Sequence, residues 1–256
     1  MGIICTTSQK PTEKMKQTSK KIAELVDGKY VPRKNLGSLN RHTYVLVVTK
    51  SAVNAYNNGK KFTFHPSMAM LRIKRIDNNE IDTFTKLLGD ISGWRVLDCT
   101  LGLGADTLVL SKLVGNTGFV TSLEKSKIIY QVVKSGFENI IYNYPELYSL
   151  SRNVRLTNID FNRYLDNVER NSYDLIYFDP MFQKPLENSA AISSLRGIAH
   201  SSRNLRQSIT KAKRVAKEAV VVKNNKNYPF NSIGLDNTFT LPSSSVSYGI
   251  YIKKED

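Results

Sequence analysis

The chain has few of the residues that mark disulfide-rich or metal-binding proteins. Its 256 residues include 2 cysteines, 3 histidines and 1 tryptophan. Cys5 and Cys99 cannot form a disulfide framework. Since both lie in apolar segments, we expect buried thiols in a reducing cytoplasm. The chain also lacks a C-x-x-C or H-x-x-x-H pair, so we predict no metal site.

Long apolar runs are missing as well. No run approaches the roughly 18 apolar residues of a membrane-spanning helix, so we expect neither such a helix nor a membrane partner. The N-terminal segment MGIICTTSQKPTEK has too short an apolar run for a secretory signal, and we predict a cytoplasmic protein. Hydrophobic residues still make up 41% of the chain, which is enough for a packed core.

Acidic residues are scarce relative to basic ones. The chain has 37 Lys and Arg against 22 Asp and Glu, a net charge of +15. Residues 1–92 hold 16 basic and 7 acidic residues (+9), and residues 93–256 hold 21 and 15 (+6). A basic excess favours a polyanionic partner such as nucleic acid, although charge alone fits an ordinary basic protein equally well.

The order of apolar segments predicts an α/β protein in two parts. From Trp94 onward, apolar strands alternate with helical segments, which is typical of a doubly wound, mostly parallel sheet. The expected strands there are 94–100, 118–124, 153–160, 172–179, 218–223 and 246–254. Before them, a strand, a helix and a hairpin at Asn58-Gly59 indicate a small α/β domain. We therefore predict a small domain over residues 1–76 and a larger one over residues 77–256.

A glycine turn follows the strand WRVLDCT. It reads D-x-T-x-G-x-G, from Asp98 and Thr100 to Gly102 and Gly104. The dinucleotide fingerprint G-x-G-x-x-G requires a third glycine, but Thr107 stands at that position. A carboxylate at Asp98 suits a cationic ligand better than a pyrophosphate. S-adenosylmethionine carries a sulfonium and an ammonium group and has no phosphate, so it fits this pattern.

Two further acids stand at the ends of the next two strands. Glu124 follows Gly104 by twenty residues (124 − 104), where a carboxylate can accept hydrogen bonds from both hydroxyls of a ribose. Asp160 could reach an adenine amino group, but it fits the N-cap of the following helix as well. In register with the glycine turn, Glu124 is favoured as a ribose ligand.

The fourth strand of the alternating region ends in the stretch Asp179-Pro180-Met181-Phe182. The Asp179 carboxylate and the Pro180 carbonyl could accept the two N–H protons of an exocyclic amine and turn its lone pair toward a methyl donor. Phe182 could stack on the base. A D-P pair alone is common at strand ends. D-P-M-F at this place in this pattern is far more specific.

These motifs, in this order, resemble class I S-adenosylmethionine-dependent methyltransferases. More closely, residues 64–254 are similar to the RsmJ/YhiQ family of small-subunit (16S) ribosomal RNA guanine-N2 methyltransferases. The resemblance rests on DCTLGLGADT, LEKS, IDF, FDPMF, VVVK and YGIY. It implies a Rossmann-like methyltransferase domain and a ribosomal RNA or small-subunit partner. The implied cofactor contacts are Ala105, Asp106, Glu124, Lys125, Asp160, Phe161 and Asp179.

Basic residues near the expected strand ends are candidates for RNA phosphate contacts. These candidates are Arg72, Lys74, Arg75, Arg196 and Lys223. A solvated basic face explains the first three equally well. Three other functions stay open: methylation of another amine (adenine N6 in RNA or DNA, or a protein glutamine), NAD-dependent oxidoreduction, and RNA binding without catalysis. The missing third glycine argues against the oxidoreductase, and the intact acids argue against a protein without catalysis.

Overall fold

The structure, a computed structural model, describes residues 2–37, 43–180, 205–242 and 244–254. The chain divides into two compact units. The first comprises the described residues up to His65 together with Ser126–Tyr148, and the second comprises the remaining described residues. The predicted division at residue 76 stays a prediction about domains.

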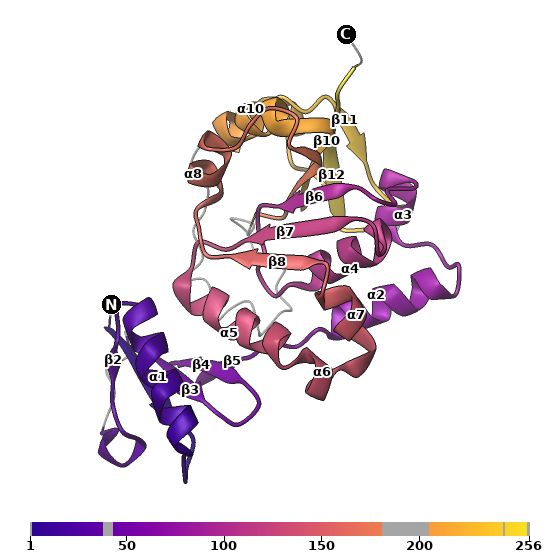
Figure 1. The fold of residues 1–256 in the computed structure, drawn as a ribbon. Coiled ribbons are helices and arrows are strands. Elements are labelled where there is room, and N and C mark those ends of the chain that lie inside the picture. The colour runs from indigo at the N-terminus through magenta and orange to yellow at the C-terminus, as the bar shows by residue number, and fades with distance from the viewer. Residues whose placement is uncertain (1, 38–42, 181–204, 243, 255–256) are drawn as a thin grey trace. The chain divides into compact units, whose positions relative to one another are not determined.

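The first unit is built on a five-stranded mixed sheet of order β2-β1-β3-β4-β5 (Figure 1). Its strands are β1 (Gly2–Thr7), β2 (Lys29–Tyr30), β3 (Thr43–Val48), β4 (Val53–Asn57) and β5 (Lys60–Phe62). Its helices are α1 (Glu13–Leu25), η1 (Arg33–Asn35), α5 (Lys127–Glu138), α6 (Ile140–Asn143) and η2 (Pro145–Leu147). β1 is parallel to β2 and β3, whereas β3, β4 and β5 form an antiparallel meander.

Local sequence explains how the helices of this unit are placed. Thr12 caps α1 by accepting a hydrogen bond from the Met15 N–H (3.3 Å), and the apolar face of the helix is buried. α5 packs on β4, where the Val53 N–H donates to Ser135 Oγ at 3.0 Å. Gly136 is required at this contact, because a Cβ there would lie 2.1 Å from the Phe64 ring.

The second unit contains a seven-stranded sheet of order β11-β12-β10-β9-β6-β7-β8. Its strands are β6 (Arg95–Asp98), β7 (Phe119–Leu123), β8 (Val154–Thr157), β9 (Tyr173–Phe178), β10 (Ala216–Asn225), β11 (Asn237–Phe239) and β12 (Val246–Ile252). Its helices are α2 (Ser67–Asp77), α3 (Thr83–Leu88), α4 (Ala105–Val114), α8 (Phe161–Asp166), α10 (Leu205–Val215) and η3 (Phe230–Ile233). A short helix, α7 (Tyr148–Ser151), carries the chain between the units.

The predicted doubly wound, mostly parallel sheet is confirmed. Neighbouring strands from β8 to β10 are parallel, and β12 pairs antiparallel with both β10 and β11. All six strands predicted after Trp94 are present, but each ends before its predicted last residue except β10, which runs on to Asn225. β11 was not predicted, because three residues are too few to show a period of two.

Helices cover both faces of this sheet. On one face, α10 and α8 enclose a core that includes Ile176 and Phe178 of β9. Side chains alternate along a strand, so Tyr177 between them points to the opposite face, where its hydroxyl reaches α4. α2 packs on α4 on that side. The helices in turn fix which strand-end side chains can meet.

The strand order reverses between β6 and β9. From β6 the chain proceeds outward to β7 and β8, and it then returns to β9 on the other side of β6. In open α/β sheets, ligands bind beyond the carboxyl ends of the strands at such a switch point. The switch therefore locates a candidate site between the ends of β6 and β9.

Candidate functional site

Four of the predicted acids line the carboxyl edge of the sheet. Asp98 is the last residue of β6, and Asp179 directly follows β9 across the switch point. Glu124 directly follows β7, and Asp160 lies just beyond β8. Because the strand order is β9-β6-β7-β8, the tertiary structure brings these acids, far apart in sequence, to consecutive positions along one edge.

The glycine turn lies at the centre of this edge. Gly102 and Gly104 have φ angles of 49° and 77°, in the left-handed region that residues with a Cβ rarely adopt. The Gly104 N–H donates to the Leu101 carbonyl at 2.7 Å, and α4 starts at Ala105. The chain can therefore reverse directly after β6, with the free N–H groups of α4 at the turn.

Asp98 is fully buried beneath this turn. Its Oδ1 accepts a hydrogen bond from the Thr100 N–H (2.9 Å), and its Oδ2 accepts from the hydroxyls of Thr107 (2.6 Å) and Ser122 (2.9 Å). Burial raises the pKa of Asp98 to about 6, although these hydrogen bonds favour the carboxylate. Asp98 thus holds the turn together from within, and its predicted contact with the cofactor stays a prediction.

Thr107 accounts for the missing third glycine. The sequence indicated only that Thr107 departs from a dinucleotide fingerprint. In the structure, its hydroxyl links Asp98 to Ser122 of β7 (3.0 Å to Ser122 Oγ) and is fully buried. A glycine could not make these contacts, so this position differs from the fingerprint for a structural reason.

Glu124 lies against the same turn. Its Oε2 accepts a hydrogen bond from the Gly102 N–H at 3.3 Å, and its backbone carbonyl accepts from Asn158 Nδ2 at 2.7 Å. Glu124 therefore lies in hydrogen-bond contact with the glycine turn, and its predicted contact with a ribose stays a prediction.

Asp160 has the local role that its sequence position allowed. It is the N-cap of α8, with Oδ1 accepting from the Asn162 N–H at 2.9 Å, and Lys125 Nζ lies 2.9 Å from its Oδ2. Phe161 packs edge-on against Phe178 of β9, with the ring centroids 5.4 Å apart. Any adenine contact of this group stays a prediction.

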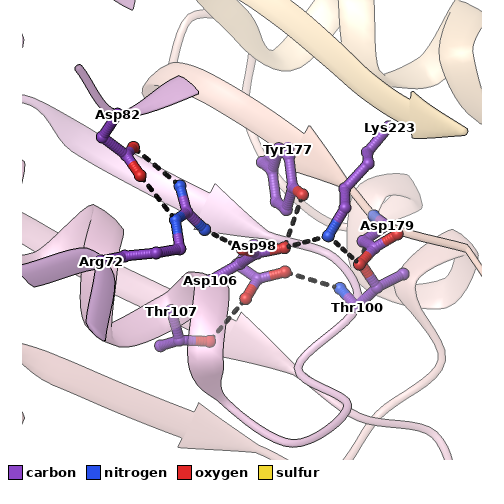
Figure 2. A network of polar contacts seen from close by, with 9 residues as sticks. All are labelled: Arg72, Asp82, Asp98, Thr100, Asp106, Thr107, Tyr177, Asp179 and Lys223. Atoms are coloured by element: carbon purple, nitrogen blue, oxygen red, sulfur yellow. Dashed lines mark hydrogen bonds and ion pairs between the residues drawn. The ribbon is translucent and has the colours of Figure 1, made fainter. Parts of the chain in front are cut away.

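A chain of alternating charges runs from α2 to Asp179 (Figure 2). Arg72 binds Asp82 in a bidentate pair, with Nε and Nη2 at 2.8 and 2.9 Å, and its Nη1 donates to Asp106 Oδ1 at 2.5 Å. Lys223 Nζ lies 3.0 Å from Asp106 Oδ2 and 2.8 Å from Asp179 Oδ2. The chain is therefore Asp82–Arg72–Asp106–Lys223–Asp179. Arg72, Asp106 and Lys223 lie on α2, α4 and β10, Asp82 is the N-cap of α3, and Asp179 directly follows β9.

Asp106 is the junction of this network. Besides the two cations, it accepts a hydrogen bond from the Tyr177 hydroxyl at 2.7 Å. Burial would raise the pKa of Asp106, but the charges of Lys223 and Arg72 outweigh it and hold the pKa well below its usual range. Asp106 is therefore ionised, and its carboxylate is bound to Arg72, Lys223 and Tyr177. A contact with the cofactor, as predicted for this residue, is open to its backbone N–H.

Asp179 has a different electrostatic environment. Burial raises its pKa, Lys223 opposes this, and the negative charge of Asp106 adds to it. Burial would lower the pKa of Lys223, but its two carboxylate partners raise it above the usual value. The ammonium group is thus fully charged, and it is the cation that stabilises the Asp179 carboxylate.

The backbone ties Asp179 to the glycine turn. The Asp179 N–H donates to Thr100 Oγ1 at 2.6 Å, and the Cys99 N–H donates to the Tyr177 carbonyl at 2.9 Å. The carboxylate of Asp179 and the turn are therefore fixed with respect to each other. The predicted roles of Asp179 and Pro180 in binding an amine stay predictions. Pro180 is described, whereas Phe182 lies outside the described residues.

The predicted phosphate contacts are not equivalent. Lys74 and Arg75 are exposed on α2, whereas Arg72 is largely buried in its two ion pairs and lies over the Phe84 ring at 4.3 Å. Lys223 is likewise committed to Asp106 and Asp179. Arg196 lies outside the described residues. For all of these residues, phosphate binding stays a prediction.

Sequence reasoning missed four members of the site. Tyr177 and Ser122 lay within apolar strands, Thr107 counted only as a missing glycine, and Asp82 had no motif around it. A hydroxyl-bearing residue within a buried strand is the signal that could have drawn attention to the first two, because a buried hydroxyl needs a partner.

The chemistry of this site fits S-adenosylmethionine. The turn from Cys99 to Ala105 contains no Lys or Arg to match a phosphate, and carboxylates lie beneath and beside it. The free N–H groups of α4 and the Glu124 carboxylate suit the carboxylate and hydroxyl groups of that cofactor. When bound, the cofactor supplies an electrophilic methyl group. Fold and site together define a class I S-adenosylmethionine-dependent methyltransferase.

Comparison with known proteins gives the family. Residues 31–253 match the SAM_MT family, whose description reads "Putative SAM-dependent methyltransferase". The chain belongs to this family, and its cofactor is S-adenosylmethionine. It is 34% identical over 253 residues to "Uncharacterized protein YpiP" of Bacillus subtilis (strain 168), covering 96% of this chain and 97% of that protein.

Two further similarities bear on substrate and fold. The chain is 35% identical over 106 residues to Ribosomal RNA small subunit methyltransferase J of Francisella tularensis subsp. holarctica (strain FTNF002-00 / FTA), 41% of each chain. The crystal structure of the SAM-dependent methyltransferase NGO1261 from Neisseria gonorrhoeae superposes with a TM-score of 0.65 at 17% identity. It covers 98% of this chain and 95% of that one. The second similarity concerns the fold alone.

The described part of the chain contains neither a candidate metal cluster nor a candidate membrane-spanning helix. No group of three or more His, Cys, Asp or Glu there could hold a metal ion. No helix within the same residues is long and apolar enough to cross a membrane.

Proposed function

We propose that this methyltransferase modifies the exocyclic N2 amine of a guanine in small-subunit ribosomal RNA. The observation that carries the proposal is the position of Asp179. It follows β9 at the switch point, its backbone is hydrogen-bonded to Thr100 of the glycine turn, and its carboxylate is held by Lys223. The partial similarity to ribosomal RNA methyltransferase J supports an RNA substrate.

Asp179 and Pro180 would bind the acceptor amine. The carboxylate accepts one N–H proton and the Pro180 carbonyl accepts the other, so the nitrogen lone pair points away from both. A new N–C bond then forms as the bond from sulfur to the methyl carbon breaks, and S-adenosylhomocysteine leaves. Positioning of this kind supplies most of the rate enhancement in a direct displacement.

The methylated nitrogen must then lose a proton. Burial and the charge of Asp106 raise the pKa of Asp179, which makes its carboxylate a better proton acceptor than an exposed one. Lys223 limits this rise, because its ammonium group favours the carboxylate form of Asp179. We assign to Lys223 the positioning of Asp179, in place of a phosphate contact.

Lys74 and Arg75 would contact RNA phosphates. Both are exposed on α2, whereas Arg72, on the same helix, is turned inward to Asp82 and Asp106. On the same helix, Arg72 would then stabilise the charge network, while Lys74 and Arg75 would bind RNA.

Mass mapping of the product tests the proposal. Small-subunit RNA from a strain that lacks the gene is incubated with the purified protein and labelled cofactor, digested to nucleosides and separated. We expect label in N2-methylguanosine, and none with Asp179→Ala, which should still bind S-adenosylhomocysteine in calorimetry. Label in N6-methyladenosine, or in ribosomal protein, would replace the guanine assignment. Full activity of Asp179→Ala would refute the site itself.

A further inference from the structure

The chain contains a long stretch without acidic residues. From Gly28 to Ile76, which is 49 residues (76 − 28 + 1), there is no Asp or Glu. The same stretch has ten Lys and Arg: Lys29, Arg33, Lys34, Arg41, Lys50, Lys60, Lys61, Arg72, Lys74 and Arg75. Most of this positive charge belongs to the first unit, whereas the charge network around Asp106 lies entirely in the second unit.

The structure distributes these cations over the first unit in a definite way. Six of them are described there and all six are exposed; we call them the basic rim. The basic rim is Lys29 on β2, Arg33 and Lys34 on η1, Lys50 after β3, and Lys60 and Lys61 on β5. β2 and β5 are the two edge strands of the sheet, so Lys29, Lys60 and Lys61 lie at its borders. η1 follows β2 closely in the chain, whereas Lys50 follows the central strand β3.

Most of the basic rim has no carboxylate partner among the described residues. Five of its cations form no ion pair with any carboxylate among the described residues: Lys29, Arg33, Lys34, Lys50 and Lys61. The basic helix α10 of the second unit is different. There Lys211 pairs with Asp166 (2.6 Å), Lys213 donates to the Gly234 carbonyl, and Arg214 donates to the Leu165 carbonyl. The three cations of α10 are thus bound to acceptors within the unit, whereas these five cations of the rim are exposed to solvent.

The spacing of the rim indicates the size of its partner. Five strands have four spacings, which separate the two edges by roughly 19 Å at about 4.8 Å per strand. A nucleotide or a phosphate ion is too small to neutralise both borders, whereas a nucleic-acid backbone can pass from one to the other. Lysines predominate, which suits contact with phosphates in any sequence.

A membrane surface fits the rim less well. Membrane-binding segments combine basic residues with exposed large apolar ones. In the segments that carry the rim, the described residues 2–37 and 43–65, the exposed large hydrophobic residue is Leu25; the other three described in the first unit, Ile141, Tyr142 and Tyr148, lie in its Ser126–Tyr148 segment. On α1, the apolar residues Met15 and Ile22 are buried in the unit.

We propose that the basic rim docks the phosphate backbone of the RNA substrate outside the reaction centre. The inference rests on the proposed function for the identity of the RNA, but the binding itself does not require catalysis. The first unit would then hold RNA by charge, while the D-P stretch selects the amine.

Charge-neutral variants with a matched control test this. The rim variants are Lys29→Gln/Arg33→Gln/Lys34→Gln at one border and Lys60→Gln/Lys61→Gln at the other. The control is Lys86→Gln/Arg170→Gln/Lys226→Gln, three exposed cations of the second unit that pair with no described carboxylate. Binding of small-subunit ribosomal RNA is measured against salt concentration, together with S-adenosylhomocysteine binding, kcat and KM.

Each phosphate contact contributes roughly 0.7 to 0.9 to the slope of log K against log salt. The triple rim variant should therefore lower that slope by roughly two to three and weaken RNA binding by up to about 100-fold at about 0.15 M salt. KM for RNA should rise with kcat unchanged, and cofactor-product binding should match the wild type. The control should match it in every respect.

The inference fails if the slope is unchanged in both rim variants, or if the control lowers it equally. Tighter binding to vesicles of phosphatidylserine than to RNA would show the rim to be a membrane surface instead. If the wild type binds RNA with the expected slope but methylates none, the proposed function fails and the docking surface stands.

Discussion

Replacement of Lys223 by methionine separates a positioning role from a purely structural one. Lys223 Nζ is shared between Asp106 and Asp179, at 3.0 and 2.8 Å. Methionine keeps the length of the side chain and removes its charge. After the substitution, Asp106 still has Arg72 and the Tyr177 hydroxyl. Asp179 keeps a neighbouring carboxylate and loses the one cation that pairs with it among the described residues.

The size of the effect follows from this asymmetry. Removing one partner of a buried ion pair costs about 3–5 kcal/mol, because the other charge stays buried without a counter-charge. Asp179 has a side-chain exposure of 29%, so water offsets part of that cost and the lower figure of about 3 kcal/mol applies. An interaction of this size corresponds to about 100-fold in rate, since about 1.4 kcal/mol equals tenfold.

The sign of the pH dependence is fixed by the charges. Loss of the ammonium group raises the pKa of Asp179 further, so the carboxylate that accepts the amine protons is lost at a higher pH than in the wild type. We therefore expect kcat of Lys223→Met to be about 100-fold lower near neutral pH and to recover as pH rises. Lys223→Arg, which keeps the charge, should restore much of the rate at neutral pH.

Single-turnover methyl transfer to small-subunit RNA across a range of pH measures this directly, with Lys226→Met as an exposed control just beyond β10. Chemical denaturation of the same variants reports the cost in folding free energy. A loss of rate that is equal at every pH would show that Lys223 acts only through the fold. A rate for Lys223→Met within a few-fold of the wild type would refute the role altogether.

Three further predictions follow from the site. Burial raises the pKa of Asp98 from 3.8 to about 6, so the folded state binds its proton more tightly than the unfolded state does. The stability of the wild type relative to Asp98→Asn should therefore fall by roughly 2 to 2.5 kcal/mol as pH rises from 4 to 7, and a flat difference in urea unfolding would contradict this. Glu124→Gln should weaken S-adenosylhomocysteine binding at least tenfold in calorimetry with little change in Tm, because it removes a charged acceptor (about 1.5–3 kcal/mol) beside Gly102; unchanged affinity would exclude the ribose role. Arg72→Met should lower the free energy of unfolding by about 3 kcal/mol, whereas Lys74→Gln should leave it unchanged and weaken RNA binding; the opposite pattern would reverse the inward and outward assignments on α2.

Much of the second unit could be predicted from local patterns. Apolar runs alternating with helical segments indicated the parallel sheet, and strand-end acids indicated which side chains would share its edge. Strand ends were harder to predict. Thr157 ends β8, although the apolar pattern runs to Asp160. Beyond Thr157, the Ile159 N–H donates to the Glu124 carbonyl, and the Asp160 side chain caps α8.

The charges around Asp179 could not be predicted from the sequence. Arg72 and Lys223 are 151 residues apart (223 − 72), and a basic residue near a strand end suits RNA as well as a buried carboxylate. Only packing distinguishes these cases. α2 lies on α4, which brings Arg72 to Asp106, and β10 pairs with β9, which brings Lys223 to Asp179.

The sequence by itself indicated the kind of ligand and the alternation of strands and helices along the chain. Glycines with left-handed φ, the acids that follow them and the D-P stretch carry that information locally, because backbone conformation and strand-end position depend on neighbouring residues. The tertiary structure decided which charges are used internally and which face solvent. Burial and charge pairing depend on elements that meet only after folding, and so Lys223 supports Asp179 while the basic rim of the first unit stays exposed.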